Sequence, residues 1–407
     1  MKIEHFPPEF ETALPVLEKI TAAGFEAYFV GGCVRDFLLH HLIHDVDIAT
    51  NATPHEIAQL FPKYFDLGIE HGTIAVLERG ETYEITTFRT EQGYEDFRRP
   101  SQVTFVRSLK EDLKRRDFTM NALAVDTNGN LIDLFDGLKD LEEKIIRAVG
   151  EPEERFSEDA LRMMRGVRFA GQLGFSIEEK TFAAMKKRHD LLEKIAVERI
   201  RVEFEKLLLG DFATSGLQAF LDSELYRCTP HLLGEDKALK TLLHALQKQT
   251  LENPVLAWTL LYDFTSKKVG IETFLRAWKL SKNLMNDVKK LTAFLPVRKT
   301  RMLNTWEVYQ LGNSLSQQLE MLMIYYQEEV DLAGVTEVFE QLPIKNKSEL
   351  DLSGDDLLKN FQYPAGLWVG AALALAEKNV VIHRWPNEKN SLLEKMAEEF
   401  PWNKYLK

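Results

Sequence analysis

Cysteines and long apolar runs are scarce in this chain. Its 407 residues contain two cysteines, Cys33 and Cys228, which cannot form a disulfide framework. A small disulfide-stabilised secreted domain is therefore excluded, and a reducing, cytoplasmic location is expected. The longest apolar run lies near residues 365–376 and is too short to cross a bilayer, so we expect no membrane partner.

An excess of positive charge is also missing. Lys and Arg number 51 against 63 Asp and Glu, and this formal net charge of −12 argues mildly against a generic nucleic-acid binder. The basic residues are concentrated, however: residues 98–116 carry seven Lys/Arg against two acids, and residues 162–206 carry eleven against seven. Each segment is either an anion-binding surface or a solvated helix face, and charge alone favours neither.

The apolar pattern changes near residue 150, and the length suggests two to four domains. Before that point we predict strands and two helices; the strands lie at 27–30, 45–49, 73–78, 81–88 and 131–134, and the helices at 9–23 and after Thr53-Pro54. Residues 89–104 are polar and predict a mobile loop. Later residues show helical periodicity, beginning with a long helix capped by Ser157 and running through 170. We therefore expect an α/β head with a mixed sheet, followed by an all-helical remainder.

Two aspartates at alternate positions occur in HisAspValAspIleAla, residues 44–49. In a strand, residues two apart point to the same face, so Asp45 and Asp47 would leave the sheet together while Val46 faces the core. Two hard oxygen ligands suit magnesium (Mg2+), which keeps waters and substrate phosphates in its other positions. An isolated Asp-x-Asp is more often a solvated turn.

A Gly-Gly pair precedes these aspartates, in GlyGlyCysValArgAsp at 31–36. Backbone amides exposed at such a helix start cradle phosphates, and Arg35 adds a guanidinium fork. A lone Gly-Gly is usually a tight turn. A strand, a Gly-Gly turn, a short helix and a strand with Asp-x-Asp form a rarer combination, which predicts a nucleotidyltransferase palm.

The segment ArgArgAspPheThrMetAsn, residues 115–121, lies at a predicted helix start. Asp117 is predicted to cap that helix, and Arg116 is the better candidate for contact with a triphosphate or sugar. Phe118, Met120 and Leu123 are expected in the core.

A second polar stripe occupies residues 158–170, where Asp159, Arg162, Arg165 and Arg168 recur every three residues. No acid follows the arginines at four-residue spacing, so the stripe requires an external anion such as a triphosphate or an RNA backbone. A solvated arginine stripe is the alternative.

The pair of Asp159 and Arg162 has a sharper possible use in base recognition. An aspartate accepts a hydrogen bond from the exocyclic amine of cytosine or adenine, and an arginine donates to the acceptors beside it. Uracil and guanine present a carbonyl to the aspartate instead, and a buried mismatch of two acceptors discriminates strongly. Such a pair would accept C and A and reject U and G.

Seven motifs in order carry a family resemblance. They are GlyGlyCysValArgAsp, AspValAspIleAlaThr, GluIleThrThrPheArg, ArgArgAspPheThrMetAsnAla, AspLeuPheAspGly, GluAspAlaLeuArg and ValGluArgIleArgValGluPheGluLysLeuLeu, all between residues 31 and 208. They resemble the class II tRNA nucleotidyltransferase / poly(A) polymerase family of the polymerase β superfamily, most closely the CCA-adding enzymes of Gram-positive bacteria.

The resemblance implies a polymerase β-like head (1–150), a helical neck (151–210), a helical body (211–312) and a tRNA-binding tail (313–407). It implies addition of C, C and A to tRNA 3′ ends from CTP and ATP without a nucleic-acid template, with two-metal catalysis by Mg2+. A homodimer is left open.

The motifs also assign roles to individual residues. By resemblance, Asp45 and Asp47 are metal ligands, and Glu84 is an acidic catalytic residue that shapes the site. The nucleotide-binding residues implied are Gly32, Arg35, Arg116, Asp159, Arg162, Arg165 and Arg168. His40 and His44 stand where many relatives have glycine, so the turn before Asp45 is expected to differ in shape.

Three alternatives stay open. A bacterial poly(A) polymerase, or an enzyme adding only CC or only A, would carry the same motifs. The segment 89–104 disfavours a CC-only enzyme, because CC-adding members lack its counterpart. A non-catalytic RNA-binding protein on the same scaffold is a distant second alternative. The third, a small-molecule nucleotidyltransferase, is disfavoured by the long helical C-terminal half and the basic neck.

Overall fold

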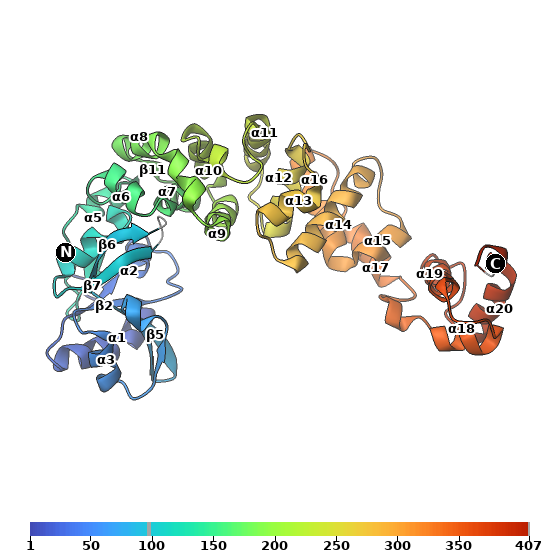
Figure 1. Cartoon of the computed structure of the whole chain (residues 1–407), viewed down its shortest axis with the longest axis horizontal. Coiled ribbons are helices and arrows are strands. Elements are labelled where there is room, and N and C mark those ends of the chain that lie inside the picture. The colour runs from blue at the N-terminus through green and yellow to red at the C-terminus, as the bar shows by residue number, and fades with distance from the viewer. Residues whose placement is uncertain (96–98, 406–407) are drawn as a thin grey trace. The chain divides into compact units, whose positions relative to one another are not determined.

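The computed structural model describes residues 1–95 and 99–405, with only the backbone described for 91–95 and 99–103. The chain divides into two compact units, one of residues 1–243 with 277–279 and the other of residues 244–276 with 280–407. Figure 1 shows that the strands belong to the first unit and that the second is helical. The division into head, neck, body and tail at residues 150, 210 and 312 stays a prediction.

The head is built on a mixed seven-stranded sheet with the order β3-β4-β5-β2-β1-β8-β9. Its strands are β1 (Ala27–Val30), β2 (Asp47–Thr50), β3 (Tyr64–Asp66), β4 (Thr73–Glu78), β5 (Glu81–Thr87), β8 (Leu123–Val125) and β9 (Leu131–Asp133). Neighbours are antiparallel except β2 and β5, which run parallel. The predicted α/β head with a mixed sheet is confirmed.

The start of the second strand was predicted wrongly. The sequence placed it at residue 45, whereas β2 begins at Asp47 and Asp45 precedes it. In the antiparallel register Phe29 lies opposite Ile48, so Val46 would have to pair with Gly31. Gly31 has φ 75° and ends β1 there, which leaves Val46 without a strand partner and only partly buried.

Three helices support the sheet. They are α1 (Pro8–Ala22), α2 (Gly32–Leu38) and α3 (Pro54–Leu60). The predicted cap at Thr53 is confirmed, because its side chain accepts from the Glu56 amide and Glu56 reaches back to the Thr53 amide. Phe10 of α1 stacks on Phe29 of β1 with ring centroids 4.3 Å apart, at the centre of the head core.

Residues 89–95 and 99–104 form two paired strands of a hairpin rather than the predicted loop. Strands β6 (Arg89–Glu95) and β7 (Arg99–Phe105) pair antiparallel, with Arg89 opposite Phe105. Two paired strands satisfy each other's backbone groups, so a hairpin can form without the apolar alternation that sequence reading requires. Residues 96–98 of the predicted loop lie outside the described residues.

Helices dominate the rest of the first unit. They are α4 (Leu109–Lys114), α5 (Gly137–Glu142), α6 (Pro152–Glu158), α7 (Leu161–Leu173), α8 (Glu179–Lys187), α9 (Val197–Leu208), α10 (Ala213–Asp222) and α11 (Asp236–Leu246, which extends into the second unit). A short parallel pair joins β10 (Ile145–Ile146) to β11 (Ser176–Ile177).

The single long helix predicted from Ser157 is in fact two helices. Ser157 lies inside α6, which ends at Glu158, and α7 begins at Leu161. Asp159 between them has extended backbone angles (φ −135°, ψ 102°). Asp159 is therefore not on α7, and only the three arginines share that helix.

Helices are the only regular secondary structure among the described residues of the second unit. Its helices are α12 (Pro254–Phe264), α13 (Ile271–Ala277), α14 (Lys282–Arg298), α15 (Thr305–Leu311), α16 (Asn313–Tyr326), α17 (Leu332–Glu340), α18 (Gly354–Phe361), α19 (Leu367–Val381), α20 (Lys389–Glu399) and α21 (Trp402–Tyr405). The apolar run near 365–376 falls in α19. Among residues 1–95 and 99–405, no helix combines the length and apolarity needed to cross a membrane.

Candidate active site

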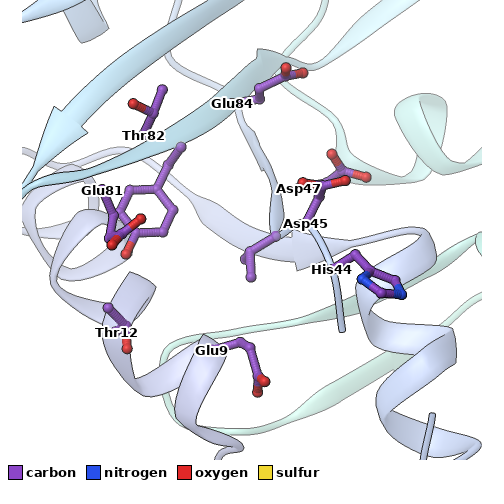
Figure 2. A pocket seen from close by; sticks show the side chains of 10 residues that line it. Glu9, Thr12, His44, Asp45, Asp47, Glu81, Thr82 and Glu84 are labelled. Carbon is purple, nitrogen blue, oxygen red and sulfur yellow. The ribbon is translucent and has the colours of Figure 1, made fainter. Parts of the chain in front are cut away.

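A cavity of about 520 Å³ opens beside the start of β2, and acidic side chains line it. Asp45 and Asp47 lie next to each other there, and Glu84 lies on the adjoining strand β5 (Figure 2). Asp47 and Glu84 are register partners of the parallel β2–β5 pair. His44 lines the same cavity, and His40 has φ 57°, a backbone conformation that glycine adopts more easily. The structure thus brings Asp45, Asp47 and Glu84 to one place.

The charges around Asp47 favour a bound cation. Loss of surrounding water in the recess raises the pKa of the Asp47 carboxyl, Arg116 opposes that rise, and the nearby Glu84 and Asp45 add to it. A divalent cation would relieve this crowding of carboxylates, and carboxylate oxygens are the donors that Mg2+ prefers. Within the described residues no group of three or more metal ligands is preassembled. Asp45 and Asp47 offer two carboxylates of the kind that could hold such a cation.

Gly31 permits an arginine to approach this recess. A Cβ atom at Gly31 would lie 2.8 Å from Arg116 Nη1 and 3.8 Å from Asp47 Oδ2. A larger residue at 31 would push the Arg116 guanidinium aside and would be strained at φ 75°. The glycine that matters most to this geometry is therefore Gly31, while the predicted Gly32 begins α2 beside it.

Arg35 is held inside the protein. Its guanidinium donates to Asn121 Oδ1 at 2.7 Å and to both carboxylate oxygens of Asp36 at 2.9 and 3.0 Å. The side chain is 11% exposed. Its predicted contact with phosphate stays a prediction, and in this structure Arg35 is an anchor between α2 and the segment that carries Asn121.

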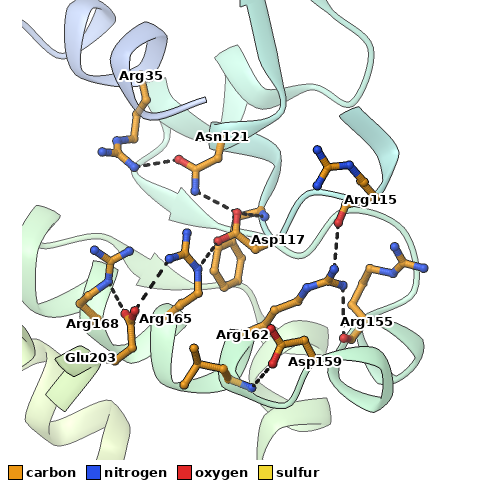
Figure 3. Close-up of polar contacts among 12 residues, drawn as sticks. Arg35, Arg115, Asp117, Asn121, Arg155, Asp159, Arg162, Arg165, Arg168 and Glu203 are labelled. Atoms are coloured by element: carbon orange, nitrogen blue, oxygen red, sulfur yellow. Dashed lines mark hydrogen bonds and ion pairs between the residues drawn. The ribbon is translucent and has the colours of Figure 1, made fainter. Parts of the chain in front are cut away.

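Asp117 connects this anchor to helix α7. It accepts from Asn121 Nδ2 at 3.0 Å and from Arg165 Nε at 2.7 Å, so hydrogen bonds run from Arg35 to α7 (Figure 3). The predicted helix cap at Asp117 is wrong. A 3-10 turn of Thr119–Asn121 follows Phe118 without a side-chain cap, and Asp117 accepts from the Phe118 amide. Phe118, Met120 and Leu123 are fully buried, as predicted.

Acid should weaken the contribution of Asp117 to folding. Burial raises the pKa of this carboxyl, but Arg165, Asn121 and the Phe118 amide outweigh it and hold the pKa well below its usual range. Because the Asp117 pKa is lower in the folded than in the unfolded protein, Asp117 stabilises the fold fully at pH values above its unfolded pKa of about 4. This stabilisation is lost as the pH falls from there toward the folded pKa. Asp117→Asn should therefore cost about 3 kcal/mol at neutral pH and progressively less below about pH 4, measured by urea unfolding across pH.

The exposed Asp190→Asn variant is the matched control for this series, and it should change the free energy of unfolding by no more than about 0.5 kcal/mol. A stability penalty for Asp117→Asn that stays constant from pH 7 to pH 3 would contradict the proposed link between the charge of Asp117 and folding stability.

The arginines of α7 have acidic partners, contrary to prediction. Arg162 donates to Glu158 Oε2 at 2.9 Å, Arg165 to Asp117, and Arg168 Nε lies 2.7 Å from Glu203 Oε2. Glu158 precedes Arg162 by four residues, and the other two acids come from distant parts of the chain. The stripe therefore does not require an external anion for charge balance, although it remains rich in guanidinium groups.

Three guanidinium groups, two of them from α7, gather around the ring of Phe169. The guanidinium carbons of Arg168, Arg35 and Arg165 lie 3.9, 5.0 and 5.4 Å from the centre of this buried ring. Burial also lowers the pKa of Arg168 to about 10, against the opposing effect of Glu203. The structure thus brings Arg35, Arg165 and Arg168 together.

The two residues predicted to read a base both contact protein here. Asp159 Oδ1 accepts from the Leu161 amide at 3.0 Å and Oδ2 from Arg199 Nη2 at 2.9 Å. Arg162 also donates to the carbonyls of Arg155 and Arg115 at 3.2 and 2.9 Å. A carboxylate has about four acceptor sites, so Asp159 retains capacity for an exocyclic amine.

Sequence reading missed several residues that build this site. Gly31, Arg199 and Glu203 lie in the quoted motifs, but no short-range spacing pairs them with the residues they contact. The contacts of Asp112 could have been predicted from the sequence, because Asp112 precedes Arg115 and Arg116 by three and four residues, the spacing of neighbours on a helix.

A mixed sheet with paired aspartates at a strand start, followed by an arginine-bearing helix, defines a nucleotidyltransferase. Residues 27–147 match the Poly A polymerase head domain, and residues 249–396 match tRNA nucleotidyltransferase domain 2. The CCA-adding enzyme of Enterococcus faecalis is 50% identical over 397 residues, 97% of each chain. That of Limosilactobacillus fermentum is 49% identical over 399 residues, 98% of this chain and 99% of its own. The chain belongs to the family of CCA-adding enzymes.

Solved structures agree with this family. The Bacillus stearothermophilus CCA-adding enzyme in complex with CTP has a TM-score of 0.88 and 37% identity, covering 98% of this chain and 99% of its own. A tRNA nucleotidyltransferase complexed with a primer tRNA and an incoming ATP analog has a TM-score of 0.60 and 26% identity, covering 80% and 98%. The predicted family, fold class and enzyme class are thereby confirmed, whereas the roles of single site residues stay predictions.

Proposed function

We propose that this enzyme adds C, C and A in turn to tRNA 3′ ends, taking CTP and ATP and releasing pyrophosphate. The observation that carries this proposal is the placement of Asp47 beside Asp45 and near Arg116, in the same unit as Asp159 and the arginines of α7. The nucleotide complexes of related enzymes support it.

In the reaction, the tRNA 3′-hydroxyl oxygen forms a bond to the α-phosphorus and loses its proton to solvent, while the bond between the α-phosphorus and pyrophosphate breaks. Asp45 and Asp47 would hold Mg2+, with Glu84 shaping the acidic recess. When bound, Mg2+ supplies Lewis acidity that lowers the hydroxyl pKa and neutralises charge on the phosphates. Arg116 would add positive charge at the triphosphate, and catalysis is then mainly positioning and charge stabilisation.

Base choice would come from Asp159 and Arg162, with Arg165 and Arg168 contributing further nucleotide contacts. The helical second unit would bind the tRNA acceptor arm through its shape and phosphates, as helical RNA requires. Cytoplasmic location and a homodimer remain proposals, and light scattering of the purified enzyme tests the dimer.

Sequencing of reaction products decides among the alternatives. Three tRNAs, lacking CCA, CA or A, are incubated with all four nucleotides. We expect each to be completed to CCA and no further. A run of A would identify a poly(A) polymerase, completion of only one substrate class would identify a partial enzyme, and no extension would favour an RNA-binding protein.

The hairpin β6–β7 is the best candidate for the switch from C to A, since one pocket must read a small pyrimidine twice and then a purine. It follows β5, which carries Glu84. Replacing residues 91–99 by a short Gly/Ser linker should leave CC addition largely intact and reduce the final A addition by about tenfold or more, as loss of a gating segment does. Single-step incorporation assays measure both.

Replacing Arg79 by glycine in the β4–β5 turn is the control and should alter neither step. Equal loss of both steps on replacement of the hairpin, or no loss, would count against the hairpin as the switch.

A further inference from the structure

One buried carboxylate in α4 is shared by two neighbouring arginines. Asp112 has no exposed surface. Its Oδ1 accepts from Arg115 Nε and Nη2 at 3.0 and 2.7 Å, and its Oδ2 accepts from Arg116 Nη2 at 3.2 Å. Burial raises the pKa of Asp112, but the two arginines outweigh it and lower the pKa, so the carboxyl is charged at neutral pH. Charge-assisted hydrogen bonds of this kind fix a guanidinium in orientation as well as in place.

The orientation of Arg116 is set from one side only. Asp112 holds Nη2, whereas Nη1 packs over Gly31 toward Asp47. Among the described residues, nothing accepts a hydrogen bond from the buried Nε of Arg116. A buried donor without a partner costs free energy, which a ligand can recover. Arg116 is therefore held by Asp112 with unused donor capacity beside the acidic recess.

Arg115, the other partner of the Asp112 carboxylate, contacts an arginine of helix α7. The backbone carbonyl of Arg115 accepts from Arg162 Nη2 at 2.9 Å. Asp112 thus holds the Arg116 guanidinium and also Arg115, whose backbone carbonyl accepts from Arg162. Asp112 itself is fully buried and reaches neither the recess nor a substrate.

We propose that Asp112 is a positioning residue for nucleotide addition, which acts by holding the Arg116 guanidinium toward the triphosphate. This proposal rests on the proposed function in so far as Arg116 binds the triphosphate. Without the carboxylate, Nη2 loses its anchor and the guanidinium can turn away from Gly31. A misplacement of about 1 Å is enough to cost on the order of 10²-fold in rate.

A double-mutant cycle separates positioning from general support of the fold. The enzymes compared are the wild type, Asp112→Asn, Arg116→Ala and the double variant, assayed for addition of C and of A. We expect Asp112→Asn to lower kcat/KM for CTP and ATP by about tenfold or more in the wild type, and by less than about twofold in the Arg116→Ala background. Multiplicative losses in the two backgrounds would overturn the proposal, because a purely structural residue does not depend on Arg116.

Asp140→Asn is the matched control. Asp140 is also a buried head carboxylate, paired with Arg147 at 3.1 Å and with the Thr119 hydroxyl at 2.6 Å. It should lower the melting temperature by an amount similar to Asp112→Asn while leaving kcat/KM within about twofold. An equal loss of activity in Asp140→Asn would show that destabilisation alone explains the effect.

Two further measurements keep the outcome decisive. If Asp112→Asn does not fold, Asp112→Glu retains the charge but displaces it by one methylene, and it should show the same loss of kcat/KM. Failure of both variants to fold would assign Asp112 to the fold and overturn the proposal.

If the wild type adds no nucleotide, the proposed function fails by itself. The double-mutant cycle is then run on CTP binding, where non-additive losses would still support positioning and additive losses would refute it.

Discussion

Asp45→Ala and Asp47→Ala should each reduce the addition of both C and A by on the order of 10³-fold or more, equivalent to about 4 kcal/mol of transition-state stabilisation. The two carboxylates face one recess with Glu84, and loss of either removes half of the pair that fits a divalent cation. Incorporation of labelled CTP and ATP at saturating Mg2+ measures the loss. Binding of tRNA should survive, because the helical second unit is proposed to supply most phosphate contacts.

Asp66→Ala is the control for these variants. Asp66 also belongs to a strand of the head sheet, but its carboxylate accepts from the Gly68 and Ile69 amides at the edge strand β3. It should retain near-normal addition. Near-normal turnover by Asp45→Ala or Asp47→Ala would refute the metal assignment.

Strands with a clear apolar pattern between turns could be predicted from the sequence. Residues 27–30 and 73–78 coincide with β1 and β4. The missed strands lack that pattern for physical reasons. All three residues of β8 (Leu123–Val125) are buried, and all three of the edge strand β3 (Tyr64–Asp66) are exposed, so neither strand shows alternation. The sequence carries no period-two signal at either place.

The break before α7 was equally invisible, because helical periodicity continues across it. Phe156, Ala160 and Met163 are all buried, as one continuous helix would require. The break is made by Asp159, which accepts from the Leu161 amide and pairs with Arg199 forty residues later. Local pattern cannot show a partner so distant in sequence, which is also why Asp117 and Glu203 were not foreseen as partners of the α7 arginines.

Candidate residues, in contrast, could be named without these contacts. Asp45, Asp47 and Glu84 line one cavity, and Arg116 reaches toward Asp47, as expected for side chains serving one reaction. The structure adds how they are held: by Gly31, whose lack of a side chain admits Arg116, and by Asp112. Gly31 has no side-chain chemistry to mark it in a sequence, and Asp112 is marked there only by its spacing from Arg115 and Arg116.

The second large effect is expected from Asp159→Ala, which should change which bases are accepted. An aspartate beside the base accepts from the amine of C or A but confronts the carbonyl of U or G with a second acceptor. Its removal relieves that buried mismatch, so selectivity against UTP and GTP should fall by about 10- to 100-fold, while triphosphate affinity changes less. Competition between nucleotides on a tRNA lacking CA, read by sequencing, measures this ratio.

The free carboxylate capacity of Asp159 makes this expectation specific. Arg199 and the Leu161 amide use two acceptor sites and orient the group, and the remaining lone pairs can face the base. Arg165→Ala should instead weaken all four nucleotides alike, because its ion pair with Asp117 is not directed at a base edge. Glu153→Ala on α6, a half-exposed carboxylate paired with Lys187 and Arg188, should leave selectivity unchanged. If Asp159→Ala kept its full preference for C and A, base reading would have to reside elsewhere, and Arg162 alone would be the next residue to test.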